Sequence, residues 1–337
     1  MTVRTTATRT RGPLLPVRIS GSASVGPGRA VSTAELVARL ATPRDAADVE
    51  RRSGIASRYF ADAGASSAEV GATVLRRALD EAGLAPEALA RIIFVCSLGG
   101  DMLFPATANV VAAKLGLAGT CDCFDLNNAC MGFLTALDIA ARGIATGEGP
   151  VGIVSVELPS RFITPDDPRP YLVFGDAAVA AVVEPARGSG GILASWLRND
   201  GLAFGNVRLG HAGLTGHPET IRFTAPSARM SEEAVEAVRR ATAAVLDAAA
   251  LTLDDVQWIL PHQPNGTFLD TITAALGAPA ARVMRMVHEF GSVGSASMPV
   301  SLDRLLHTAP VRPGDRVLMV GVGAGISSGA VLLELDA

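Results

Sequence analysis

The chain has 337 residues, of which 49% are hydrophobic and 18% are charged, and its formal net charge is −4. A chain of this length can bury a substantial core, and this composition is typical of a globular protein and excludes intrinsic disorder. The charge gives no indication of nucleic-acid or anionic-membrane binding. No apolar run is long enough for a membrane helix or a signal peptide, so we expect a cytoplasmic protein.

The four cysteines (Cys96, Cys121, Cys123 and Cys130) are too few and too clustered for a disulfide framework. Cys121 and Cys123 have the spacing of a metal-binding pair, but no second Cys or His pair lies nearby in the sequence. We therefore expect Cys121 and Cys123 to lie on two faces of one buried strand, and we expect no metal site.

Along the first half of the chain, apolar periodicity and turn residues alternate. Residues 1–16 show no periodicity, which indicates a flexible tail. Ser32 followed by Glu35 is typical of a helix start. The other elements that the pattern predicts are a strand at 17–24, a basic loop at 51–59, a helix at 66–83, a strand at 92–97 and a helix at 106–115.

The second half of the chain repeats the first. Leu79–Leu84 followed by Ile92–Val95 resembles Leu246–Leu251 followed by Ile259–His262, at an offset of 246 − 79 = 167 residues. Three further echoes follow in the same order, which favours duplication over chance. We expect an N-terminal half at 17–187 and a C-terminal half at 188–337, each an α/β unit with buried, mostly parallel strands.

The stretch Cys121–Leu134 carries the first candidate for chemistry. An apolar run gives way to two asparagines, and a helical pattern then begins close to Cys130. This predicts a strand, a tight turn, and a cysteine on the first turn of a helix. The helix dipole and free backbone N–H groups at that place would favour the nucleophilic thiolate and lower the thiol pKa.

Three further segments could bring partners to this thiol. His262 follows a predicted buried strand at 258–260, at the edge of the sheet where α/β proteins bind ligands. Its alternative is a surface histidine that caps the next helix. Gly291–Ser297 is a small-residue loop that could be a plain tight turn. Gly321–Gly325 is a glycine-rich loop whose backbone N–H groups could form an oxyanion hole.

Taken in order, the blocks Asn128–Phe133, Pro261–Asn265 and Phe290–Pro299 resemble the three catalytic blocks of the β-ketoacyl-acyl-carrier-protein synthase III family, within the thiolase superfamily. The resemblance runs from about Arg51 to Ala337. It implies an α/β protein with the five-layered αβαβα thiolase-like fold, built from two duplicated halves and assembled as a homodimer.

The resemblance also implies roles for individual residues. Cys130 matches the nucleophile that takes an acyl group from a CoA or carrier-protein thioester, and His262 matches the active-site histidine. The backbone N–H groups of Cys130 and Ala324 match the oxyanion hole, although the family usually has glycine at the second position.

Other matches concern substrate and partner binding. Phe104 matches a phenylalanine that reaches into the acyl pocket of the neighbouring subunit in the family's homodimers. Asn265 and Gly323 are assigned to substrate binding. No cofactor is implied beyond the acyl thioester substrate itself.

Two positions depart from the family pattern. The loop asparagine that works with the histidine is Ser292 here, and an arginine implicated in carrier-protein docking is Thr267. An amide reaches further than a hydroxyl and is a fixed donor, and loss of one such donor costs roughly 3 kcal/mol of transition-state stabilisation. Stabilisation of the malonyl enolate should suffer, whereas acyl loading should survive.

The leading functional hypothesis is therefore an acyltransferase of natural-product biosynthesis. It would load an acyl group from acyl-CoA or acyl-carrier protein onto Cys130 and pass it to a hydroxyl or a carrier thiol, with His262 as general base and Ser292 in the asparagine's place. The first alternative is a priming condensing enzyme that uses malonyl-carrier protein. The second is a non-catalytic partner subunit of a ketosynthase, against which the presence of both Cys130 and His262 argues.

Overall fold

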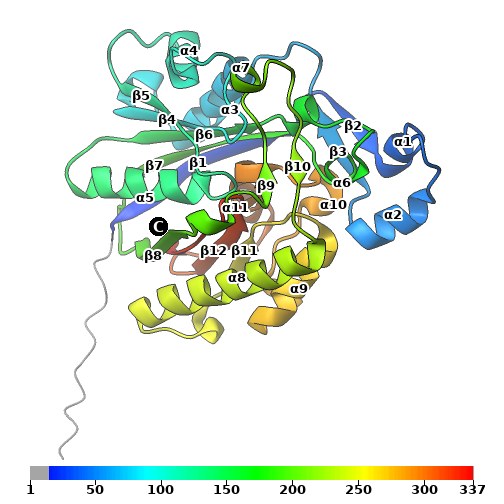
Figure 1. Cartoon of the computed structure of the whole chain (residues 1–337). Helices are drawn as coiled ribbons and strands as arrows, with labels where there is room; N and C mark the ends of the chain where they lie inside the picture. Colours follow the sequence, from blue (N-terminus) through cyan, green and yellow to red (C-terminus); the bar gives the residue numbers. More distant parts are fainter. Residues whose placement is uncertain (1–14, 337) are drawn as a thin grey trace, which may run out of the picture.

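The computed structural model describes residues 15–336 and contains two central sheets (Figure 1). The predicted tail at 1–16 falls mostly outside the described residues. Its last two residues are attached to the body, because Leu15 bridges Ile192 and the carbonyl of Pro16 accepts a hydrogen bond from the N–H of Ala186. The predicted boundary of the tail was wrong for these two residues.

The first sheet has five strands in the order β1-β7-β6-β4-β5. Their bounds are β1 Val17–Val25, β4 Arg91–Val95, β5 Asp122–Leu126, β6 Val151–Glu157 and β7 Ala177–Pro185. The second sheet has four strands in the order β11-β12-β13-β8. Their bounds are β8 Gly191–Asn199, β11 Trp258–Pro261, β12 Arg316–Gly323 and β13 Ser327–Glu334.

The two sheets share one topology. In the first, β1 runs antiparallel to β7, β7 antiparallel to β6, and β6 parallel to β4. In the second, β8, β13, β12 and β11 repeat that order and those directions. In the first half, β5 pairs in parallel with β4. At the equivalent position, the second half has only a parallel bridge between Ile259 and Val283. The structure therefore consists of two duplicated halves.

Helices fill three layers around these sheets. Helices α5 (Gly132–Ala145) and α11 (Ser297–Thr308) lie between the sheets and share one apolar cluster with both. Helices α3 (Ser67–Ala82) and α4 (Thr107–Lys114) cover the outer face of the first sheet. The result is a five-layered αβαβα arrangement (Figure 1).

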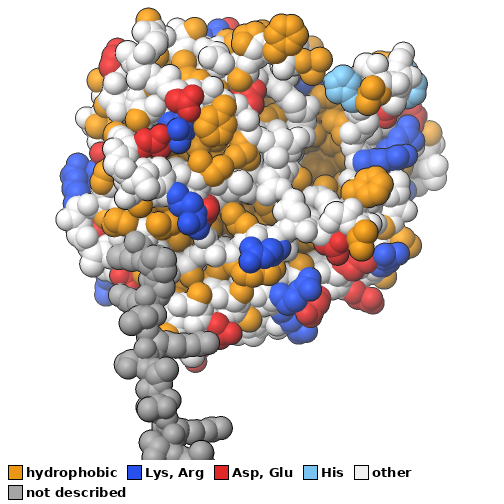
Figure 2. Space-filling view, turned by 60° about the vertical axis from the view of Figure 1, so that its left-hand side comes forward, with side chains coloured by type: hydrophobic (Ala, Val, Ile, Leu, Met, Phe, Trp, Pro, Cys, Tyr) orange, Lys and Arg blue, Asp and Glu red, His pale blue; other side chains and the backbone are white. Residues whose placement is uncertain are grey.

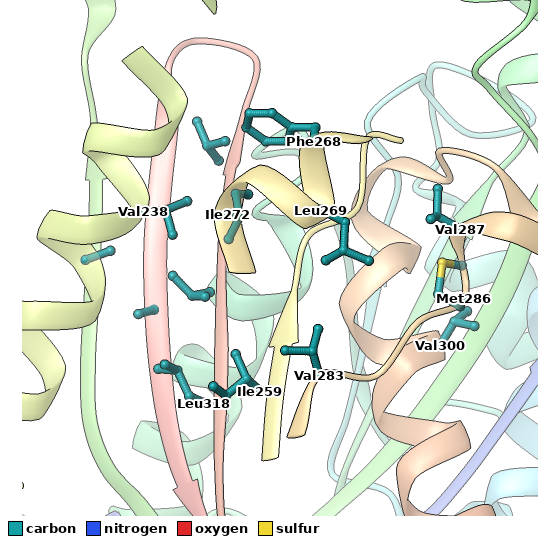
Figure 3. Packing of buried hydrophobic residues seen from close by; sticks show 14 of the residues in the cluster. Val238, Ile259, Phe268, Leu269, Ile272, Val283, Met286, Val287, Val300 and Leu318 are labelled. Carbon is teal, nitrogen blue, oxygen red and sulfur yellow. The ribbon is translucent and has the colours of Figure 1, made fainter. Parts of the chain in front are cut away.

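The outer face of the second sheet is covered by α8 (Ser227–Ala249) and α9 (Gly266–Leu276). Figure 3 shows Phe268, Leu269 and Ile272 of α9 among the apolar side chains that pack over the strands of this sheet. Burial of such side chains is the main contribution to the stability of this layer.

Several predicted elements are confirmed with small changes at their ends. Ser32 caps the short helix α1 (Thr33–Val37) by accepting a hydrogen bond from the N–H of Glu35. Helix α3 is capped by Ser66 and ends at Gly83. The predicted basic loop at 51–59 was wrong: helix α2 (Ala46–Ser53) and strand β3 (Ser57–Phe60) occupy this stretch.

The remaining elements are short. Strand β2 (Arg29–Ser32) pairs with β3, and β9 (Val207–Arg208) pairs with β10 (Arg222–Phe223). The short helices are α6 Pro168–Tyr171, α7 Ala212–Thr215 and α10 Val287–Phe290. Within the described residues, none of the helices is both long and apolar enough to cross a membrane.

Candidate active site

Cys130 lies in a tight turn between β5 and α5. Its predecessor, Ala129, has a φ of +46°, in the left-handed region that is unusual for a residue with a side chain. Helix α5 begins at Gly132 with Met131 as its N-cap, so Cys130 precedes the helix and does not lie on its first turn as predicted. A Cβ at Gly132 would lie 2.5 Å from Val95 Cγ1, so the turn packs closely against β4.

His262 follows β11, and its backbone N–H donates to the carbonyl of Val320 at 2.8 Å. The side chain is only 3% exposed, and its Nδ1 has no hydrogen-bond partner in the described part of the chain. Burial disfavours the imidazolium form and lowers the pKa of His262 to about 4. The imidazole is therefore neutral near pH 7.

Strand β12 brings His262 and Cys130 together through two glycines on one face. A Cβ at Gly321 would lie 2.6 Å from His262 Cβ, and a Cβ at Gly323 would lie 2.9 Å from the backbone N of Cys130. Alternate residues of a strand point to the same side, about 6 to 7 Å apart. The predicted glycine loop at 321–325 is therefore partly strand, and the absence of side chains there lets both residues approach.

Ser292 is 3% exposed and its backbone is fixed on both sides. Its N–H donates to the carbonyl of Val173 at 2.8 Å, and its carbonyl accepts from the N–H of Gly175 at 3.0 Å. The Oγ of Ser292 makes no hydrogen bond to other residues that the structure describes, so this hydroxyl is available to a ligand.

A cavity of about 730 Å³ contains Cys130, His262 and Ser292 in its lining. Backbone at Gly323 and Ala324 lines the same cavity. The rest of the wall is mostly apolar, with arginines among the lining residues: Arg44, Arg52, Arg169, Val49, Leu172, Phe174, Val207, Phe223, Met230, Phe268 and Ile326. The residues that the sequence assigned to catalysis thus lie around one space large enough for an acyl thioester.

The electrostatics of Cys130 differ from the prediction. The pKa of its thiol is raised to about 12, first by burial and second by the negative charge of Glu157. Hydrogen bonds from the backbone N–H groups of Ala324 and of Cys130 itself act in the opposite direction. The predicted low pKa was wrong, because desolvation outweighs the dipole of a helix that begins only at Gly132.

The other sequence-derived residues are distributed as follows. Asn265 caps α9, since its Oδ1 accepts from the N–H of Phe268 at 2.8 Å, and it also lines the cavity. Thr267 lines the cavity and donates to the carbonyl of Arg52. Phe104 is 85% exposed and is not part of the cavity wall in this chain.

Cys121 and Cys123 differ from the expected residues of a buried strand. They lie at edge strand β5, are half-buried, and their sulfurs are 3.6 Å apart. The two sulfurs lie close together because residues two apart on a strand have their side chains on the same face. All four cysteines are free thiols.

Comparison with known proteins identifies the family. Residues 124–201 match the family model described as 3-oxoacyl-[acyl-carrier-protein (ACP)] synthase III, and residues 246–335 match the model of its C-terminal part. A β-ketoacyl-[acyl-carrier-protein] synthase III from Rhizorhabdus wittichii is 34% identical over 319 residues, which cover 94% of this chain and 98% of the relative. The chain belongs to the β-ketoacyl-acyl-carrier-protein synthase III family.

Solved structures of synthase III enzymes have the same fold. That from Aquifex aeolicus superimposes with a TM-score of 0.87 at 28% identity, covering 94% of this chain and 99% of the other. The priming β-ketosynthase of the R1128 polyketide pathway gives a TM-score of 0.87 at 30% identity, covering 95% and 96%. The thiolase-like fold predicted from the sequence is confirmed.

Proposed function

We propose that this synthase III homologue is an acyltransferase that loads an acyl group from acyl-CoA or acyl-carrier protein onto Cys130 and passes it to a hydroxyl or a carrier thiol in natural-product biosynthesis. The observation that carries the proposal is Ser292, whose unpaired hydroxyl faces the cavity where condensing relatives would place an amide. No cofactor other than the thioester takes part.

In the first step, the thiol of Cys130 attacks the carbonyl carbon of the thioester. Because the pKa of this thiol is raised, the resting form is neutral, and its proton passes to the neutral His262 as the carbon–sulfur bond forms. The N–H groups of Cys130 and Ala324 stabilise the oxyanion. The bond to the departing sulfur then breaks, and the CoA or carrier thiolate takes up the proton.

In the second step, the acceptor hydroxyl or thiol enters the same cavity. It loses its proton to His262 and attacks the acyl carbon, and the bond to Cys130 Sγ breaks. The hydroxyl of Ser292, which lines the same cavity, can donate to or accept from the acceptor. The thiolate of Cys130 regains a proton, and the enzyme returns to its resting state.

Decarboxylative condensation with malonyl-carrier protein is the second candidate. It is favoured by the relatives, since the R. wittichii protein and the A. aeolicus structure are both named as synthases of this type. It requires an enolate held by two donors; the serine hydroxyl reaches less far than an amide, and complete loss of one donor costs roughly 3 kcal/mol. A non-catalytic role is disfavoured because Cys130 and His262 line one cavity.

We also propose that the protein works as a homodimer in the cytoplasm. Three consecutive apolar residues, Met102, Leu103 and Phe104, are 45%, 82% and 85% exposed, as expected for a surface that a partner covers. Figure 2 shows several separate patches of apolar side chains, interspersed with charged and other groups, on the face in view.

Mass spectrometry tests the proposal directly. The protein is incubated with acyl-CoAs from acetyl to octanoyl and with the corresponding acyl-carrier proteins, and the intact mass is measured for wild type and for Cys130→Ala. We expect the mass of one acyl group on wild type and none on the variant. Absence of any adduct on the wild type would overturn both enzymatic functions.

Addition of malonyl-carrier protein then separates transfer from condensation. We expect little carbon dioxide from wild type and at least a tenfold gain for Ser292→Asn. Brisk carbon dioxide release by the wild type would refute the acyltransferase and establish the condensing enzyme.

A further inference from the structure

Glu157 is a fully buried carboxylate that the reaction above does not use. It is the last residue of β6, its side chain is 0% exposed, and burial raises its pKa. No cation contributes to holding it in the described structure; only neutral donors do so. A buried carboxylate without a positive partner is costly, so its hydrogen bonds must compensate for the lost hydration.

The donors to Glu157 come from two segments, one that follows β4 and one in the loop that carries Ser292. Ser97, which follows β4, donates its N–H at 3.0 Å and its Oγ at 2.8 Å. Ser295, three residues after Ser292, donates its N–H at 3.3 Å and its Oγ at 2.5 Å. The carboxylate thus joins the end of β4 to the loop that carries Ser292.

The loop also packs directly on this carboxyl group and on the turn of Cys130. Gly294 has a φ of +52°, and a Cβ there would lie 3.1 Å from Glu157 Cδ. A Cβ at Gly132, two residues after Cys130, would lie 3.6 Å from Ser295 Cβ. The Glu157–Ser295 contact therefore supports both the Ser292 loop and the turn that presents the nucleophile.

We propose that Glu157 is a positioning residue for acyl loading, whose carboxylate anchors Ser295 and so holds the Ser292 loop and the turn of Cys130 in place. The proposal rests on the acyl transfer proposed above. The same carboxylate also acts on the thiol of Cys130, because its negative charge disfavours the thiolate.

Glu157→Gln separates positioning from a general effect on folding. The amide keeps the shape and one acceptor oxygen, but it removes the charge and replaces Oε2, the acceptor of Ser97 Oγ, with a donor. Its neutral oxygen holds Ser295 less strongly than the carboxylate does. Two rates are measured: loading of the best acyl-CoA found above, and alkylation of Cys130 by iodoacetamide between pH 7 and 10. We expect loading to fall at least tenfold while alkylation at pH 8 becomes several times faster.

Ser295→Ala is the second variant, since it removes one anchor and keeps the charge. We expect slower loading without faster alkylation. Asp303→Asn is the matched control: Asp303 is 9% exposed and accepts from Ser22 and Ser24, but its charge does not act on Cys130. It should load and alkylate like wild type.

The proposal is overturned if Glu157→Gln loads at the wild-type rate, or if its loading and alkylation fall by the same factor. Should this variant fail to fold, loading of Ser295→Ala at the wild-type rate overturns it. If wild type takes no acyl group, the proposed function fails, and the alkylation rates still decide on Glu157: an unchanged profile in Glu157→Gln overturns its role.

Discussion

At the scale of single residues, the site depends on two glycines, which have no side chain to fill the space beside them. Gly321 and Gly323 leave space on one face of β12, and His262 and Cys130 occupy that space. Neither glycine needs a positive φ, because both lie in a regular strand. Their role is close approach, which places His262 and Cys130 at neighbouring positions on one face of the strand.

Gly323→Ala tests this role. The new Cβ would lie 2.9 Å from the N of Cys130 and 3.0 Å from its Cβ, so the turn must move. Such overpacking costs about 1–3 kcal/mol, and a displaced thiol should load acyl groups at least tenfold more slowly. Gly201→Ala is the control, since its Cβ would meet nothing within 4 Å. Equal loading rates for the two variants would contradict the close-approach role.

His262 leads to a prediction about stability and pH. Its pKa is about 4 in the folded protein and about 6.5 when unfolded, so the unfolded state binds a proton first as the pH falls. The free energy of unfolding should therefore be unaffected above pH 6.5 and should decrease by up to about 3 kcal/mol between pH 6.5 and 4.

Urea unfolding of wild type and His262→Gln at pH 7 and pH 4.5 measures this term. The variant lacks the titrating group, so its stability should decrease less over this interval than that of wild type. An equal decrease in both proteins would show that His262 does not contribute.

The sequence was informative about which residues form the site and less so about their environment. The order of the blocks around Cys130, His262 and Ser292 predicted residues that line one cavity. The raised pKa of Cys130 and the anchoring by Glu157 depend on contacts between distant segments. Helix-dipole reasoning uses only local sequence, so it could not include the desolvation that dominates.

At the scale of elements, local signals decided which predictions succeeded. Helix α3 has a serine cap at its start and a glycine cap at its end, and the predicted bounds of 66 and 83 fall on these two residues. Helix α2 has the same kind of signals, since Asp45 accepts from the N–H of Ala47 and Gly54 has a φ of +66°. Its two arginines, Arg51 and Arg52, fell within the predicted basic loop, although arginine is a good helix former.

The cap of α3 gives a prediction for this scale. Ser66 Oγ accepts from the N–H of Glu69 at 3.1 Å and donates to Asp101 at 2.7 Å. Ser66→Ala should lower the free energy of unfolding by about 1 kcal/mol. Thr73→Ala removes an exposed hydroxyl from the same helix and should cause no loss, because alanine is the better helix former. Urea denaturation compares them, and equal values would argue against a capping contribution.

At the scale of the whole molecule, duplication explains the convergence of the site. The turn after β5 in the first half and the segments after β11 and β12 in the second lie at corresponding ends of two equivalent sheets. Offsets in the sequence were enough to predict two halves, whereas the five layers were implied by the family resemblance. They could not show that the second half keeps only a bridge at Val283 in place of a fifth strand, since a single pair of residues leaves no periodic pattern.

The last prediction concerns assembly and follows from the exposed apolar run at 102–104. An isolated exposed leucine is common on protein surfaces, but three consecutive exposed apolar residues are typical of an interface. We expect wild type to sediment as a dimer and Phe104→Asp to dissociate to monomers at micromolar concentration, because a buried charge without a partner disfavours association. Leu214→Asp is the control: Leu214 is 88% exposed on α7 and stands alone. An interface at Phe104 would be contradicted if Phe104→Asp stays as dimeric as Leu214→Asp, or if wild type is a monomer. The site would then be complete within one chain.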